Sequence, residues 1–217
     1  MRRELSTRNQ QIAALNGSLH ELTAGETPSV IFARNESRQH GNFYPASYRN
    51  ICAHPARRLA KVHTGSRRAS PRAGWRWREL DCANSSDALL MNIFCCRRTL
   101  KNRALISMLG VPSGLVPQFG FRPEIPLRSG KTDRTEIDMK IGDLMVEAKL
   151  TETGFQTAPV RMIDRYRDLG EVFDSGELMV SGDVVRGYQL IRGVLAAHAR
   201  GGSFCVLCDA RDRKSVV

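Results

Sequence analysis

Apolar and polar residues alternate along residues 135–150, on both sides of the pair Gly142-Asp143. A two-residue connection that contains glycine is typical of a β-hairpin turn, so the alternation predicts two short antiparallel strands that meet there. In the register that this turn sets, one face of the hairpin is apolar and packs against the core. Its cross-strand pairs are Ile141 with Leu144, Met139 with Val146, and Ile137 with Ala148.

The opposite face of the predicted hairpin is charged, with Asp138 facing Glu147 and Glu136 facing Lys149. Directly opposed like charges destabilise an antiparallel pair, and a divalent cation such as Mg²⁺, which prefers carboxylate oxygens, removes that conflict. Lys149 projects from the same face and is placed to orient a water or to stabilise charge on a phosphate. The alternative is an exposed face on which Glu136 and Lys149 form an ordinary cross-strand pair. A register slip of one residue would exchange the two faces.

The segments around the hairpin predict an α/β fold with a mixed central sheet flanked by helices. A helix is expected to begin at Asn84 as its N-cap, with Asp87 as the reciprocal capping partner, and to run to about Met108. A near-continuous apolar run after the hairpin predicts a last, buried strand. The remaining expectations are a strand over Gly114–Leu127, a polar turn over Arg128–Arg134, helices over Gln156–Phe173 and Asp183–Ala199, and the last strand over Ser203–Cys208.

The first eighty residues are poorer in regular patterns and richer in loop-forming residues. A helical turn or two is expected around Gln11–Leu15, a short strand at Ser29–Phe32, a basic helix at Pro55–Val62 and an extended entry at Trp75–Glu79. Aromatic residues also cluster next to Arg49, namely Phe43, Tyr44 and Tyr48. Such rings stack on bases or sugars in nucleic-acid-binding proteins, but more often they fix a loop to the core, and we favour the core interpretation.

Charge is concentrated in the same part of the chain. The net charge is +11 over 217 residues, and residues 1–80 hold 14 Lys and Arg against 5 Asp and Glu. A balance of this kind favours a polyanionic partner, and we expect DNA to bind a basic linker over residues 64–75 and the extended entry at Trp75–Glu79. The residues assigned to that contact are Arg67, Arg68, Arg72, Arg76 and Arg78. The alternative is a solvated basic arm with no ligand.

Asp138, followed by Glu147-Ala148-Lys149 at the end of an apolar strand, resembles the signature of the PD-(D/E)XK nuclease superfamily, with Ile137 in the place that Pro often takes. The resemblance implies the restriction-endonuclease-like fold with an α-β-β-β-α-β core. It implies that Asp138 and Glu147 bind Mg²⁺ (or Mn²⁺) and that Lys149 assists phosphodiester hydrolysis. Asp87, with Glu79 as the alternative, would be the further acidic residue that the first core helix often supplies near the metal.

More of the chain is similar to bacterial restriction endonucleases of this superfamily, over about residues 75–209. The similar segments are Asn84–Phe94 and Lys149–Glu152 with Phe155. Gln156 and Tyr166 resemble positions that shape the active site in some relatives, although helix surface is the interpretation that we prefer for both.

These observations predict a Mg²⁺-dependent nuclease that hydrolyses DNA, with a homodimer as a possible assembly. The alternatives are a non-catalytic basic nucleic-acid-binding protein and a structural domain with a coincidental motif. We expect a basic N-terminal extension over residues 1–74, a nuclease-like core over 75–211 and a non-native tail over 212–217. The polar start and the lack of an apolar run of about 18 residues predict a cytoplasmic protein with no membrane partner. The irregular spacing of the cysteines, including Cys205 and Cys208, predicts buried thiols and no zinc site.

Overall fold

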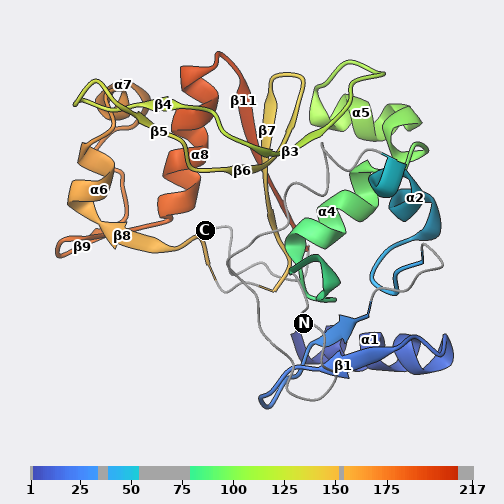
Figure 1. Cartoon of the computed structure of the whole chain (residues 1–217). Helices are drawn as coiled ribbons and strands as arrows, with labels where there is room; N and C mark the ends of the chain where they lie inside the picture. The colour runs from blue at the N-terminus through green and yellow to red at the C-terminus, as the bar shows by residue number, and fades with distance from the viewer. Residues whose placement is uncertain (1, 34–38, 54–78, 152–153, 210–217) are drawn as a thin grey trace. The chain divides into compact units, whose positions relative to one another are not determined.

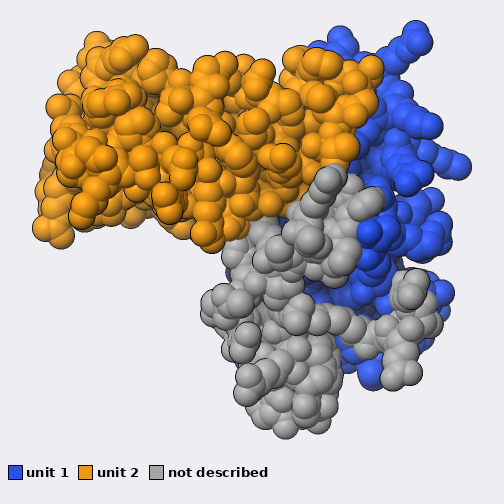
Figure 2. Space-filling model, turned by 45° about the horizontal axis from the view of Figure 1, so that its top comes forward, with its two compact units in different colours: residues 1–108, 148–151 blue, residues 109–147, 152–217 orange. Residues whose placement is uncertain are grey.

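The computed structural model describes the chain except for residues 1, 34–38, 54–78, 152–153 and 210–217 (Figure 1). Its contacts divide the chain into two compact units, which are coloured separately in Figure 2. Unit 1 comprises residues 1–108 and 148–151, and unit 2 comprises residues 109–147 and 152–217. The predicted boundary between residues 74 and 75 and the predicted tail lie outside the described residues, as do the helix expected at Pro55–Val62 and most of the extended entry at Trp75–Glu79.

Unit 2 is built on a sheet whose strand order, within the described residues, is β11-β7-β6-β3. Strand β6 pairs antiparallel with both β3 and β7. The chain is therefore mixed α/β with a central sheet and flanking helices, as predicted at that level. The strand bounds are β3 Gln118–Phe121, β6 Ile137–Ile141, β7 Leu144–Lys149 and β11 Ser203–Cys208. The last strand has the predicted bounds, but it is half-buried and not buried as predicted.

The hairpin of β6 and β7 has the register that the alternation predicted. Met139 pairs with Val146, Lys140 with Met145 and Ile141 with Leu144, so the turn is Gly142-Asp143. Gly142 has a φ of 57°, a left-handed conformation that glycine adopts without steric cost.

The elements that surround the sheet in unit 2 are shorter than predicted. Helix α8 packs its apolar side chains into one core cluster with Met145 of β7 and also contacts β11. Two small sheets accompany it, one of β4 with β5 and one in the order β8-β10-β9. The bounds are β4 Ile125–Pro126, β5 Thr132–Asp133, β8 Thr157–Pro159, α6 Val160–Asp164, α7 Leu169–Val172, β9 Val180–Ser181, β10 Val184–Arg186 and α8 Tyr188–Ala199.

Left-handed backbone positions explain where the predicted long elements of unit 2 were wrong. The strand expected over Gly114–Leu127 is interrupted at Glu124, which has a φ of 61°, so β4 is separate from β3. The helix expected from Gln156 starts as strand β8, with Gln156 at a φ of 59°, and its helical part is split into α6 and α7. The helix expected from Asp183 begins only after Gly187, whose φ is 72°, because the residues before it pair as β10.

Unit 1 contains a β-hairpin, several helices and two 3-10 turns. Strands β1 and β2 pair antiparallel, and Val30 and Phe32 of β2 pack on Ala13 of α1. The predicted strand at Ser29–Phe32 is confirmed as β2, and the helical turns near Gln11–Leu15 are the end of α1. The bounds are α1 Arg2–Leu15, β1 His20–Leu22, β2 Val30–Phe32, α2 Pro45–Ala53, η1 Glu79–Asp81, α4 Ser86–Phe94, η2 Thr99–Lys101 and α5 Arg103–Leu109.

The single helix predicted from Asn84 to Met108 is wrong at its start and in its length. Ser85 is the N-cap of α4, and its side chain accepts a hydrogen bond from the Ala88 backbone N–H at 3.1 Å. Helix α4 ends at Phe94, and α5 begins after Asn102, whose side-chain oxygen accepts a hydrogen bond from the Leu105 backbone N–H at 3.2 Å. Asn102 is thus an N-cap signal that the apolar periodicity concealed. None of the helices in the described residues has the length and apolar character that a membrane span requires.

Candidate active site

The two predicted carboxylate ligands occupy matching positions on the paired strands β6 and β7. The last pair of the ladder is Met139 with Val146, and one position further along both strands are Asp138 and Glu147. Alternation along β7 directs Glu147 to the same face as Met145, which is buried in the unit 2 core. Glu147 is 3% exposed and Asp138 is half-buried. A carboxylate as buried as Glu147 is costly to ionise unless a cation or hydrogen-bond donors compensate it.

Lys149 follows Glu147 by two positions on β7, so the strand period directs both side chains to one face. Lys149 is half-buried, as expected for a long side chain whose charged end reaches solvent or a ligand. Glu136, the residue predicted opposite Lys149, forms an ion pair with Arg122 with 3.7 Å between Nε and Oε2. Both groups of that pair reach solvent, so the pair contributes little to stability.

The donor set on this face suits a hard divalent cation. Among the described residues, no three His, Cys, Asp or Glu side chains gather as a ready-made metal site, so Asp138 and Glu147 are the pair to consider. Mg²⁺ in proteins is often held by one or two carboxylates, with waters and substrate phosphates completing its octahedron. Asp138 and Glu147 fit that pattern. Asp87 is 5% exposed in the first turn of α4 in unit 1, and its role as a further ligand stays a prediction.

Helix α8 contributes a buried cation that the sequence patterns did not reveal. Arg192 is only 7% exposed, and its Nε has no hydrogen-bond partner within the described residues. The guanidinium carbon lies 5.7 Å from the centre of the Tyr188 ring, and no carboxylate of the described chain pairs with it. Helix α8 and Met145 of β7, which is on the same strand face as Glu147, contribute side chains to one buried core cluster. The sole signal in the sequence is a charged residue within an otherwise apolar helical stretch.

A hydrogen-bond network centred on Asp133 holds the segment before β6 in place. The Asp133 carboxylate accepts hydrogen bonds from the Thr135 backbone N–H at 2.8 Å, from the Tyr166 hydroxyl at 2.6 Å and from the Arg165 guanidinium at 2.8 Å. Burial raises the pKa of Asp133, but the hydrogen bonds from Thr135 and Tyr166 and the charge of Arg165 outweigh it and hold this pKa below its usual range. Burial and the bond to Asp133 raise the pKa of Tyr166, which also contacts the Tyr188 hydroxyl at 3.1 Å.

The structure tests some of the other predicted roles and leaves some untested. Tyr166 is fully buried, so the helix surface that we preferred for it is wrong. Cys205 and Cys208 are free thiols but half-buried, so the prediction that they are buried is wrong; partial burial raises the pKa of Cys205. The five arginines predicted to contact DNA lie outside the described residues, and their role stays a prediction.

Comparison with known proteins identifies a family for this chain. A family model described as Restriction Endonuclease associating with ARP matches residues 16–215, which is most of the chain. None of the curated proteins matches the chain. None of the solved structures matches it either.

Proposed function

Since the chain belongs to the family described as Restriction Endonuclease associating with ARP, we propose that it is a Mg²⁺-dependent nuclease that hydrolyses phosphodiester bonds of DNA. The observation that supports the proposal is the register of β6 and β7, whose last pair, Met139 with Val146, is next to Asp138 and Glu147. Two carboxylates next to each other on neighbouring strands repel each other, and a divalent cation removes that repulsion.

In this proposal the chain's own residues have separate roles. Asp138 and Glu147 would hold Mg²⁺, which when bound supplies charge stabilisation and a more acidic water. Lys149 orients the attacking water or stabilises negative charge on the scissile phosphate. Arg192 of α8 binds a phosphate oxygen, because an anion at that place would satisfy the Nε–H that the described residues leave without an acceptor. The apolar cluster around Met145 and Tyr188 excludes water from behind the site.

The competing proposal is a basic nucleic-acid-binding protein that performs no hydrolysis. It is motivated by the net charge of +11, and it assigns no role in binding to Asp138 and Glu147. The two are separated by incubating the purified protein with supercoiled plasmid in Mg²⁺ and in chelator. A nuclease nicks the plasmid in Mg²⁺ alone. A binding protein retards the plasmid in both buffers, with an affinity that falls steeply with salt, and leaves it supercoiled.

A further inference from the structure

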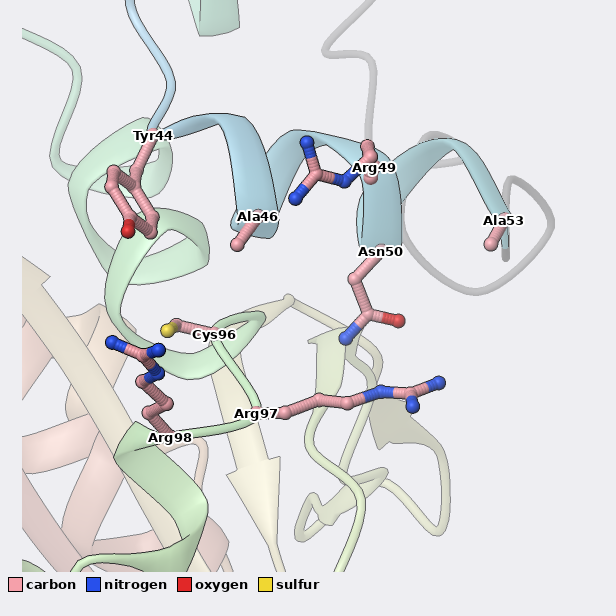
Figure 3. Close-up of a pocket in the computed structure, with 8 residues that line it drawn as sticks. All are labelled: Tyr44, Ala46, Arg49, Asn50, Ala53, Cys96, Arg97 and Arg98. Atoms are coloured by element: carbon pink, nitrogen blue, oxygen red, sulfur yellow. The ribbon is translucent and has the colours of Figure 1, made fainter.

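A basic pocket lies within unit 1, between helix α2 and the turn that joins α4 to η2 (Figure 3). Its volume is about 500 Å³, within the range of about 300–1,000 Å³ that is typical of small-ligand sites. Tyr44, Arg49 and Asn50 line it from α2 and the residue before that helix. Cys96, Arg97 and Arg98 line it from the turn.

The pocket is strongly electropositive. Three arginines line it, namely Arg49, Arg97 and Arg98, and no acidic residue is among the lining residues. In the described part of the chain none of these three arginines forms an ion pair. Figure 3 shows the Arg98 guanidinium near Tyr44 and Cys96, and the Arg97 side chain extending below Asn50. Guanidinium groups without carboxylate partners are well suited to bind phosphate through paired N–H donors.

The thiol of Cys96 lies next to Arg98 and to several hydrogen-bond donors of the turn. Partial burial raises its pKa, but hydrogen bonds from the backbone of Arg98 and Thr99, a further bond from the Thr99 side chain and the charge of Arg98 together lower the pKa below its usual value. The loop thus favours a negative charge at this place.

Hydrogen bonds from polar side chains join helix α2 to helix α4 and to the residue that follows it. The Asn50 amide donates a hydrogen bond to the Cys95 carbonyl at 2.8 Å. The Ser47 hydroxyl donates a hydrogen bond to the Asn92 carbonyl at 2.7 Å, and the Asn92 side-chain oxygen accepts one from the Tyr44 backbone N–H at 2.7 Å. These bonds join α2 to α4, so the arginines are held on a preformed frame and binding does not have to order it.

The aromatic residues near Arg49 are divided between core and pocket. Phe43 and Tyr48 stack on each other and on His40, so the core interpretation is correct for these two. Tyr44 turns away from that stack and lines the pocket with 58% of the residue exposed. An exposed aromatic ring beside three arginines is a combination that binds a base and a phosphate together.

We propose that this pocket binds one nucleotide unit, with its phosphate on Arg98, its base against the ring of Tyr44, and Arg49 and Arg97 adding to the positive charge of the pocket. The unit has two possible sources, a free mononucleotide or a nucleotide within a single strand. The proposal does not depend on hydrolysis at the hairpin. It therefore stands or fails separately from the proposed nuclease activity.

Alkylation of Cys96 by iodoacetamide tests the proposal, with the modified peptide quantified by mass spectrometry. The full chain is assayed in chelator, so that an oligonucleotide stays intact, with deoxyadenosine monophosphate, a short single strand or inorganic phosphate. We expect a nucleotide ligand to slow alkylation of Cys96 at concentrations at least about tenfold lower than inorganic phosphate requires, because stacking adds to the anion contact. Protection by the mononucleotide assigns a free ligand, and protection by the strand alone assigns a nucleic acid. Alkylation of Cys208 in β11 is the internal control.

Variants test the phosphate contact and the base contact separately. Arg97→Gln combined with Arg98→Gln removes protection, whereas Arg103→Gln, at an exposed position of α5 outside the pocket, keeps it. Tyr44→Ala weakens nucleotide binding by about tenfold in calorimetry, and Tyr44→Phe retains it because the ring remains. Equal protection by phosphate and nucleotide would overturn the base contact. The whole proposal is overturned if neither ligand protects Cys96 in the wild-type chain.

Discussion

The backbone N–H of Ser203 donates a hydrogen bond to the backbone carbonyl of Asp143, with 3.0 Å between nitrogen and oxygen. This bond joins the start of β11 to the turn of the hairpin that carries Asp138 and Glu147. The residue before it, Gly202, permits the approach, because a Cβ at that position would lie 2.2 Å from the Asp143 carbonyl oxygen. The last strand thus fixes the hairpin turn by backbone contact.

Replacing Gly202 should therefore destabilise the chain. We expect Gly202→Ala to lower the free energy of unfolding by about 1–3 kcal/mol, because backbone atoms have to move apart to admit the methyl group. Urea denaturation measures the change. Gly170→Ala in helix α7 is the matched control, since a Cβ at that position would meet no atom within 4 Å. If the two variants had equal free energies of unfolding, the backbone at Gly202 would not lie as close to the Asp143 carbonyl as the structure has it.

The Asp133 network predicts a pH dependence of stability. Folding lowers the pKa of this carboxyl, so its contribution is fully present above the ordinary value of 3.8 and is lost as the pH falls through the lower folded value. Asp133→Asn should lower the free energy of unfolding at pH 7 by about 1–3 kcal/mol, because buried donors lose a charged acceptor. It should also flatten the decline in stability below pH 4. Urea unfolding at pH 7 and pH 3 tests both.

The matched control for Asp133 is Asp164→Asn, which changes an exposed carboxylate of α6. We expect it to leave the stability at both pH values close to that of the wild type. If Asp133→Asn and Asp164→Asn shared the same pH profile, the network would not be a source of acid sensitivity.

Arg192 should matter to activity more than to stability. Arg192→Met keeps the side-chain volume and removes a buried charge, so the free energy of unfolding should stay unchanged or rise. Plasmid nicking in Mg²⁺ should fall by at least about tenfold if the guanidinium binds phosphate, because charge-assisted hydrogen bonds are lost. Arg186→Met, at an exposed position of β10, is the control for nicking. A stable variant with full activity would assign Arg192 a packing role.

The hairpin was predictable because its signal is local. Alternation and the Gly142 turn determine the register, and with it the faces of Asp138 and Glu147. The bounds predicted for the long strands and helices were wrong because these elements are interrupted at residues with a positive φ, such as Glu124 and Gln156. The residue type at these two positions does not indicate such a conformation. Arg192 and the arginine pocket were not predicted since both depend on packing between segments distant in sequence.

The most direct measurement is plasmid nicking in Mg²⁺ by the wild-type chain and by Glu147→Gln. The substitution keeps the size of the side chain and removes the charge that would hold the metal. We expect nicking to fall at least about 100-fold, which corresponds to the several kcal/mol that metal-based charge stabilisation supplies. Glu177→Gln, an exposed change in the same unit, should cleave as the wild type does. A folded Glu147→Gln chain that still nicks DNA at the wild-type rate would contradict the hairpin as the active site.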